Sequence, residues 1–246
     1  MRFRTILKDL CPPLLWRWLL RIRPAATFSG DYSDFDAASK ASEGYTSANI
    51  IRGEIAAFQS TDLQSSSLDE RTIQLLAAFA TIPGPLRVLD YGGASGYYYY
   101  RLSRYLRYAL DWTVFETKPM VEAFGSLNPP GLRHTAEIED PYDVALFSGS
   151  LQYLPAPYEV LSALTPKTKY LIFNRLPLMR STRDRLMVQK SVMHYTSSYP
   201  VWFFSQEKLI DFVSRLGTIT MQWTMSGDVA ILEGKRVPYS GLVVEL

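Results

Sequence analysis

The chain has 246 residues, of which 47% are hydrophobic and 20% charged, a composition typical of one globular domain with at most a small appendage. Its 26 Lys and Arg against 24 Asp and Glu give a formal net charge of +2, too little for a surface that neutralises nucleic-acid phosphates. The single Cys and two His supply neither an internal disulfide nor the four ligands of a structural zinc site. We therefore expect a cytoplasmic protein with no nucleic-acid partner and no metal.

Residues 1–26 form a basic N-terminal segment, of which residues 1–23 are amphipathic and rich in aromatic side chains. Arginines interrupt its apolar runs before the roughly 20 residues that a membrane span needs, and it lacks the cleavage site of a secretory signal. Two interpretations stay open. The segment packs its apolar stripe on the domain, or it makes peripheral contact with anionic lipids at the inner face of the membrane.

Residues 27–85 are expected to form a helical arm that acts as a lid. Ser, Asp, Gly and Tyr dominate residues 27–47, which predicts a loop leading into a short helix at 34–41. Helical spacing of apolar residues predicts two longer helices, at 48–58 and 68–81, before a Pro-Gly-Pro sequence.

From residue 86 to 246, apolar runs alternate with helical patterns. Strands are expected at 86–90, 112–116, 143–147 and 170–174, with helices at 96–110, 118–127 and 157–164 between them. Such spacing implies right-handed crossovers and a doubly wound α/β fold with a mostly parallel sheet. The remaining predicted parts are an irregular segment at 175–200, a helix at 206–216, and strands at 218–224 and 240–245 that form an antiparallel hairpin at the sheet edge.

The most informative stretch is R-V-L-D-Y-G-G-A-S-G at residues 87–96, a strand that ends in Asp90 and enters a glycine turn. Ligands of open α/β sheets bind at the carboxyl ends of strands, where Gly92, Gly93 and Gly96 let the backbone approach a ligand closely. The G-x-G-x-x-G fingerprint of dinucleotide sites is not matched, and a carboxylate here would repel a pyrophosphate. S-adenosylmethionine carries cationic groups and no phosphate, so Asp90 can help to hold it.

Glu116 closes the next predicted strand, and its two oxygens can accept hydrogen bonds from both ribose hydroxyls of such a cofactor. Tyr97, nearest to Gly96, is the tyrosine of Y-Y-Y-Y that we expect to face the cofactor, and Glu137 is a candidate partner of the adenine amino group. The alternative is a plain turn followed by a solvated glutamate.

At these residues the chain resembles class I S-adenosylmethionine-dependent methyltransferases, and more narrowly a bacterial family of predicted methyltransferases found among O-antigen and capsule biosynthesis proteins. The resemblance covers nearly all the chain from residue 28, through F-S-G-D-Y-S-D-F-D-A-A, S-E-G-Y up to Tyr45, V-L-D-Y-G-G-A-S-G, L-Q-Y-L at 151–154, D-R-L-M-V-Q and S-Y-P-V-W-F-F-S. It departs at N-R-L-P from Asn174, where the family carries D-R-T-P. The resemblance implies a class I methyltransferase domain over 86–246, and by association a sugar or glycan acceptor.

Methyl transfer to oxygen is an in-line displacement that needs an aligned acceptor, exclusion of water and often a base. By resemblance, we expect Ser148 and Gln152 to line the pocket, although this stretch can also begin a packing helix. Tyr45, next to Gly44, is expected to fold over the cofactor as a lid, with a simple helix cap as the alternative.

The catalytic candidates follow the strand at 170–174 and are His194, Arg175, Asp184, Arg185 and Tyr199. His194 has the pKa range of a general base, but a lone histidine is more often structural. Arg175 and Arg185 can clamp a carboxylate or phosphate of the acceptor, unless Arg185 forms a salt bridge to a nearby acid. Tyr199 can stack on a sugar ring or belong to the aromatic core.

These residues predict an S-adenosylmethionine-dependent methyltransferase, and the resemblance implies that it O-methylates a sugar or glycan precursor in surface polysaccharide biosynthesis. Two alternatives remain open from the sequence. One is a catalytically silent, cofactor-binding subunit of a glycan-assembly complex, which the absence of a compelling general base supports. The other is a nicotinamide-dependent sugar oxidoreductase.

Overall fold

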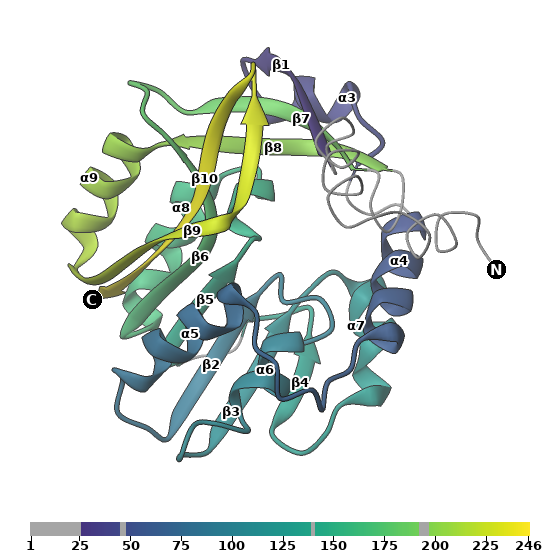
Figure 1. Ribbon diagram of the computed structural model, residues 1–246, viewed down its shortest axis with the longest axis vertical. Helices are drawn as coiled ribbons and strands as arrows, with labels where there is room; N and C mark the ends of the chain where they lie inside the picture. Colours follow the sequence, from purple (N-terminus) through teal and green to yellow (C-terminus); the bar gives the residue numbers. More distant parts are fainter. Residues whose placement is uncertain (1–25, 45–47, 139–140, 192–196) are drawn as a thin grey trace, which may run out of the picture.

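A mixed β-sheet lies at the centre of the molecule, within the residues that the computed structural model describes, 26–44, 48–138, 141–191 and 197–246 (Figure 1). Its strands are β2 (Leu86–Tyr91), β3 (Leu110–Phe115), β4 (Leu132–Thr135), β5 (Val144–Ser148), β6 (Tyr170–Met179), β9 (Thr218–Leu232) and β10 (Lys235–Glu245). The order is β4-β3-β2-β5-β6-β10-β9, with β10 antiparallel to both neighbours and the pairs from β4 to β6 parallel. This confirms the predicted mostly parallel sheet with a C-terminal antiparallel hairpin.

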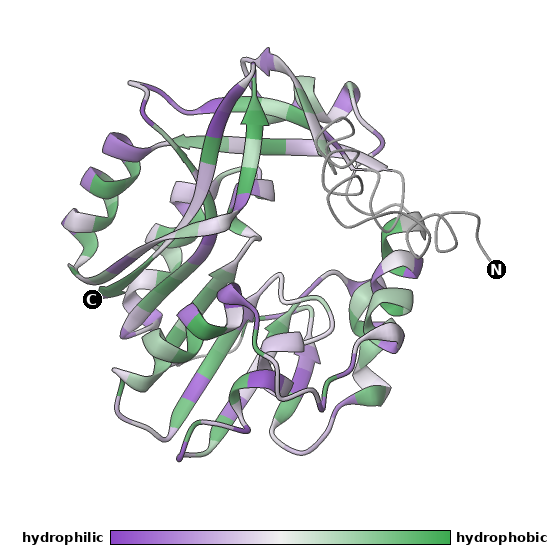
Figure 2. Ribbon diagram, viewed as in Figure 1, coloured by the Kyte–Doolittle hydropathy of each residue, from purple (hydrophilic) through white to green (hydrophobic). Residues whose placement is uncertain are grey.

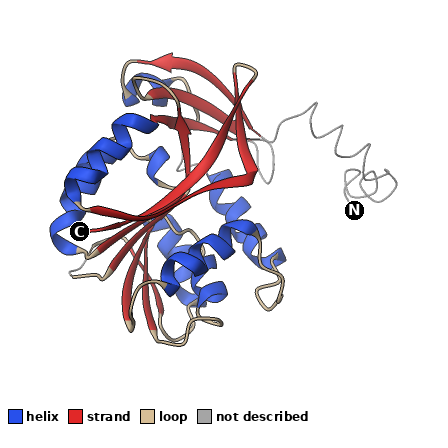
Figure 3. Ribbon diagram, turned by 60° about the vertical axis from the view of Figure 1, so that its left-hand side comes forward, coloured by secondary structure: helices blue, strands red, loops and turns tan. Residues whose placement is uncertain are grey.

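Helices cover both faces of this sheet (Figure 3). The described α-helices are α3 (Phe35–Lys40), α4 (Ala48–Ser60), α5 (Glu70–Ala80), α6 (Tyr97–Leu102), α7 (Lys118–Phe124), α8 (Pro157–Leu164) and α9 (Gln206–Leu216). Side chains alternate between the faces of a strand, so neighbouring residues of β2 join different cores. Val88 belongs to the cluster that contains Leu75 of α5, and Leu89 to the cluster that contains Leu161 of α8 and Leu209 of α9.

Helices α8 and α9 have the bounds that the sequence predicts. Hydrophobic and hydrophilic residues alternate along α9 (Figure 2), and its apolar stripe buries Leu209 and Val213. The hydroxyl of Ser205 caps this helix by accepting a hydrogen bond from the backbone N–H of Lys208 (3.3 Å). Of the described helices, none is both long and apolar enough to cross a lipid bilayer.

The helix predicted at 96–110 is shorter than expected, because α6 has only six residues. Arg101 near its end is buried, and its guanidinium donates to the carbonyl oxygen of Ser65 (2.7 Å) in the loop before α5. The hydroxyl of Tyr108 donates to the carbonyl oxygen of Phe79 (2.7 Å). The residues after α6 are therefore held against α5 instead of continuing the helix.

Three strands extend the sheet beyond β6 in an antiparallel group, β1 (Ala26–Tyr32), β7 (Arg185–Ser191) and β8 (Ser197–Ser205). Only the last two residues of β8 pair with β6. The sequence predicts a loop where β1 lies and an irregular segment at 175–200, and both expectations are wrong. Pro200 argues against a strand in the sequence, because proline has no backbone N–H to donate. In the structure β8 pairs with β7 alone at Pro200, and proline is tolerated at such an edge position.

The C-terminal hairpin is longer than the strands predicted at 218–224 and 240–245. Glu233 and Gly234 connect β9 to β10 with positive φ angles of 51° and 76°, the conformation of a tight two-residue hairpin turn. Strand β4 is also absent from the sequence prediction, because its four residues are too few to show a period.

Candidate functional site

The carboxyl ends of the parallel strands border a cavity of about 560 Å³. Three parts of the chain form its wall. The strand ends and the loops after them contribute Tyr91, Gly92, Phe115, Glu116, Ala136, Ser150 and Tyr153. The arm contributes Phe35, Ser39 and Gly44, and strand β8 contributes Tyr199 and Pro200. Strand β2 has β3 on one side and β5 on the other, so the cavity lies where the strand order reverses. Ligands of open α/β sheets bind at this point, and the volume suits a small molecule.

The glycine turn follows β2 and approaches the cavity closely. Gly92 has a φ of 72°, and a side chain there would bring its Cβ within 2.8 Å of the Cβ of Ser150. At Gly93 a Cβ would collide with the carboxylate of Asp90. Both positions therefore require glycine, and Gly92 opens the cavity while Gly93 covers Asp90.

Asp90 lies beneath this turn and is 1% exposed, outside the residues that line the cavity. Its Oδ2 accepts a hydrogen bond from the indole N–H of Trp112 (3.1 Å), and its Oδ1 has no partner among the described residues. Burial, together with repulsion from Glu116, raises the pKa of Asp90 to about 7 although Trp112 opposes the shift. The predicted contact between Asp90 and a cofactor stays a prediction, and the observed hydrogen bond joins the carboxylate to Trp112 of β3.

Glu116 follows β3 and lies on the cavity wall. Its Oε2 accepts the backbone N–H of Thr117 (2.9 Å) and its Oε1 that of Ala94 (3.3 Å). Burial raises the pKa of Glu116, and these two amides counteract part of that rise. Each oxygen keeps a further lone pair, so the carboxylate can accept two hydroxyl groups from a ligand.

His134, at the end of β4, supports the same turn and was not a candidate in the sequence. Its Nε2–H donates to the carbonyl oxygen of Ala94 (2.8 Å), a residue with a φ of 49°. The ring stacks on Phe124 at 5.8 Å between centroids, and its Nδ1 lies 2.7 Å from Oδ1 of Asn128. Burial lowers the pKa of His134, although the hydrogen bond to Ala94 opposes the shift. Strand β4, which the sequence patterns do not predict, places this histidine beside the turn, so no local signal points to its role.

Three of the predicted cofactor residues, Tyr97, Ser148 and Gln152, lie outside the cavity wall. The Ser148 hydroxyl accepts from the side-chain amide of Asn174 (3.1 Å), and the Gln152 amide donates to the backbone oxygen of Arg175 (3.3 Å). Gly96 also lies off the wall, with a φ of 72°. The cavity is lined instead by Ser150 and Tyr153, the close neighbours of Ser148 and Gln152 in the same motif.

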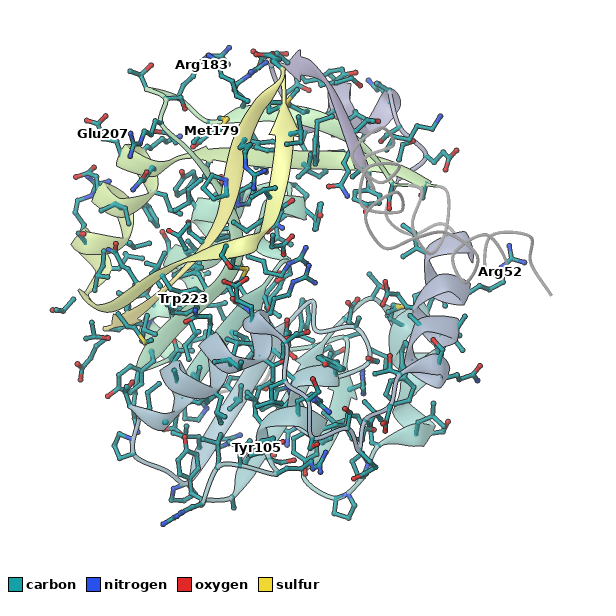
Figure 4. The ribbon with its side chains drawn as sticks, in the orientation of Figure 1. Arg52, Tyr105, Met179, Arg183, Glu207 and Trp223 are labelled. Atoms are coloured by element: carbon teal, nitrogen blue, oxygen red, sulfur yellow. The ribbon has the colours of Figure 1, made fainter. Side chains whose placement is uncertain are left out.

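The structure separates Arg185 from Arg175. Arg185 pairs with Glu233 (2.8 Å) and Asp31 (3.3 Å) and lines a different cavity of about 720 Å³ beside the β9–β10 hairpin. Arg183, which also pairs with Asp31 (2.6 Å), lies at the periphery of the molecule (Figure 4). The salt-bridge alternative for Arg185 therefore describes its observed contacts, and its carboxylate partners differ from that of Arg175, which is Asp228.

Asp184 makes contacts that connect secondary structure elements. Its Oδ1 accepts the backbone N–H of Ser205 (2.7 Å), its Oδ2 pairs with Lys208 (2.6 Å), and the Tyr158 hydroxyl donates to it (3.1 Å). The side chain is 6% exposed and lies outside the cavity wall.

Tyr199 lies on the cavity wall, opposite the strand ends, and is one of the predicted catalytic residues. Its hydroxyl accepts from the amide of Gln189 (3.1 Å), whose Oε1 accepts from the hydroxyl of Tyr153 (3.1 Å). The two tyrosine rings meet edge to face at 5.2 Å. Two other predicted residues, His194 and Tyr45, lie outside the described residues, as does the segment 1–23.

No family model and no curated protein matches this sequence. Among solved structures, the N-terminal domain of EvdMO1, crystallised in the presence of SAH and D-fucose, is similar with a TM-score of 0.51 and 11% identity, over 73% of this chain and 84% of that chain. The glycopeptide N-methyltransferase MtfA, complexed with S-adenosylmethionine, is similar with a TM-score of 0.51 and 11% identity, over 74% of this chain and 96% of that chain. At this identity the likeness establishes the fold, which is that of class I methyltransferases.

Proposed function

We propose that the protein is an S-adenosylmethionine-dependent methyltransferase that binds its cofactor in the 560 Å³ cavity. The observation that carries the proposal is the position of Glu116. This carboxylate closes β3, lies on the wall of the cavity beside the glycine turn, and keeps lone pairs directed to neither backbone amide. A ribose with two free hydroxyls satisfies such an acceptor.

The cavity wall has the chemistry that the rest of the cofactor needs. Phe115 and Ala136 lie on the wall near Glu116 and offer apolar contact for an adenine ring, whereas Gly92 leaves room for the methionine part. The buried Oδ1 of Asp90, which has no partner among the described residues, adds negative charge beneath the turn and favours a cationic ligand. The bound cofactor supplies an electrophilic methyl group on its sulfonium.

The chain itself orients the acceptor and excludes water. The Tyr153–Gln189–Tyr199 hydrogen bonds fix two phenol groups at the cavity. Burial raises the pKa of Tyr153, so at neutral pH this side chain is a hydrogen-bond donor and not a base. Phe35, Ser39 and Gly44 of the arm lie on the same wall, which supports the role of residues 27–85 as a lid.

A sugar or glycan hydroxyl is the acceptor in this proposal. The resemblance to polysaccharide-associated methyltransferases supports it, and so does the likeness to the EvdMO1 domain crystallised with D-fucose. Peripheral contact of residues 1–23 with the inner face of the membrane belongs to the same proposal, because it would bring the protein to lipid-linked glycan precursors.

Calorimetry with S-adenosylmethionine, S-adenosylhomocysteine and NAD tests the cofactor. We expect both adenosyl ligands to bind and NAD not to bind. The Glu116→Gln variant should bind S-adenosylhomocysteine about 10- to 100-fold more weakly, because hydrogen bonds to a charged group contribute about 1.5–3 kcal/mol. Glu122→Gln, an exposed position on α7, is the matched control. Binding of NAD alone would favour the oxidoreductase, and adenosyl binding without transfer to any glycan would favour the silent subunit.

A further inference from the structure

Two arginines converge on a single carboxylate oxygen beside the cavity. The Nε of Arg175 lies 2.7 Å from Oδ2 of Asp228, and Nη2 of Arg71 lies 2.8 Å from the same atom. Arg175 comes from β6, Arg71 from α5 and Asp228 from β9, so three elements that are distant in sequence meet here (Figure 1). Two positive charges and one negative charge leave this triad with a net charge of +1.

Two neighbouring carboxylates also accept hydrogen bonds from backbone amides, and that of Glu70 interacts electrostatically with Arg71. Asp69 caps α5 by accepting the N–H of Thr72 (2.8 Å), and Glu70 accepts the backbone N–H groups of Ser226 (2.8 Å) and Gly227 (3.1 Å). The positive charge of the triad is partly shielded from water, because the Arg175 side chain is 28% exposed and that of Asp228 17%. A charge in such a position interacts more strongly with a ligand than one at an open surface.

The Arg175 guanidinium is fixed before any ligand arrives. Its backbone has a φ of 60°, a conformation that a non-glycine residue keeps only where its surroundings impose it. The group lies 5.2 Å from the centre of the Tyr239 ring, and a Cβ at Gly149 would lie 3.0 Å from its Nη1. Asp228 holds Nε, so the two Nη groups are directed elsewhere.

The triad adjoins the proposed acceptor side of the cavity. Gly149 directly precedes Ser150, and the electrostatic influence of Arg175 reaches the hydroxyls of Tyr98 and Tyr153. Ser150 and Tyr153 line the cavity. Burial raises the pKa of both tyrosines, so they stay phenols, and Tyr153 on the cavity wall can exchange hydrogen bonds with the hydroxyls of a sugar.

We propose that Arg71 and Arg175 bind a carboxylate on the acceptor, so that the substrate is an anionic sugar of the uronic acid class. Guanidinium groups bind carboxylates through paired N–H donors, and the Nη groups of Arg175 are not used by Asp228. Arg71 thus takes the place that the sequence analysis gave to Arg185. This inference rests on the proposed methyltransferase function, since it concerns the acceptor side of the same cavity.

The test uses the full chain saturated with S-adenosylhomocysteine and titrated with D-glucuronate, D-glucose and D-glucose 6-phosphate. Calorimetry gives the dissociation constants, and spectra of protein carrying ¹⁵N-arginine report which guanidinium groups contact the ligand. We expect D-glucuronate to bind at least tenfold more tightly than D-glucose and to shift the Nε–H signals of Arg71 and Arg175. Equal binding of D-glucuronate and D-glucose, or binding of neither, would overturn the proposal. If D-glucose 6-phosphate binds more tightly than D-glucuronate, the proposal of a carboxylate is also overturned, in favour of a phosphorylated sugar.

Variants separate this inference from the cofactor proposal. Arg71→Gln should reduce the preference for D-glucuronate at least tenfold and leave the affinity for S-adenosylhomocysteine unchanged, and Arg71→Lys should restore part of the preference. Arg71 is 40% exposed, so the substitution is compatible with folding, which thermal unfolding checks. The matched control is Arg180→Gln, an exposed arginine outside the cavity wall. If the wild-type protein does not bind S-adenosylhomocysteine, that result contradicts the cofactor proposal and not the inference about the acceptor.

Discussion

Asp90 places a carboxylate under the glycine turn, where one of its two oxygens has no partner among the described residues. Trp112 satisfies the other oxygen and Gly93 covers the carboxylate. Such burial penalises the ionised form, and the pKa of Asp90 accordingly rises to about 7. The charge therefore destabilises the free protein, a cost that a cationic ligand above the turn would offset.

The Asp90→Asn variant should lack the part of the pH dependence of the free energy of unfolding that comes from ionisation of Asp90. The pKa of Asp90 is near 3.9 in an unfolded chain and about 7 in the folded protein, so the folded state binds the extra proton between these values. The free energy of unfolding of the wild type should fall, relative to the variant, by up to about 1.4 kcal/mol per pH unit as the pH rises through this window. Above pH 7 the difference should become constant.

Urea denaturation at pH 4.5, 6 and 8 measures this difference. Asp111→Asn, at an exposed position on β3, is the control and should follow the wild type at every pH. Parallel curves for Asp90→Asn and the wild type would show that Asp90 ionises normally.

The elements that follow β6 are connected by the side chain of Asp184. One carboxylate joins the start of β7, the backbone where β8 meets α9, and the Tyr158 hydroxyl of α8. Burial and the neighbouring Asp184 raise the pKa of Tyr158, which keeps this phenol protonated as a donor. These contacts give Asp184 a role in the position of the antiparallel strands that complete the cavity.

Asp184→Ala should destabilise the protein by about 3 kcal/mol, because it leaves Lys208 and the Ser205 N–H without their buried acceptor. Affinity for S-adenosylhomocysteine should stay within about twofold of the wild type under conditions where the variant is folded. Thermal unfolding and calorimetry measure both quantities. Asp211→Asn, which removes an exposed ion pair with Arg215, is the control and should change the stability by less than about 0.5 kcal/mol. A variant of normal stability that lacks methyl transfer would restore Asp184 as a catalytic residue.

The cavity lies between two parts of one sheet, its parallel strands and its antiparallel extension. The parallel strands contribute the glycine turn and Glu116, and the antiparallel group contributes Tyr199 and Pro200 from β8. The arm adds Phe35 and its neighbours. A ligand in the cavity would therefore contact segments from both ends of the described chain and bind the folded state alone.

S-adenosylhomocysteine should raise the melting temperature of the whole protein. At a ligand concentration of 100 times its dissociation constant, the folded state gains about 2.7 kcal/mol, which corresponds to a rise of about 5–10 °C for a chain of this length. NAD at the same concentration should leave the melting temperature unchanged. Differential scanning fluorimetry with both ligands checks this, and a rise with NAD alone would contradict the proposed cofactor.

Local sequence patterns determined the parallel strands β2, β3, β5 and β6, but not β4, and the glycine turn that borders the cavity. Strand β2, the glycine turn and Glu116 follow one another in the chain, and α8 and α9 have their predicted bounds, because hydrophobic period, caps and glycines act over a few residues. The resemblance to class I methyltransferases pointed to the same architecture. Short-range patterns were therefore sufficient for the fold class and for one half of the cavity.

Tertiary structure alone decided which distant side chains meet. Strand β1 forms only because β7 lies beside it, Arg71 rather than Arg185 joins Arg175, and His134 supports the glycine turn from β4. Each of these depends on long-range pairing of segments, whose partners no local propensity specifies. The polar contacts of the acceptor side are long-range in this sense, and for that physical reason they appear only in the folded molecule.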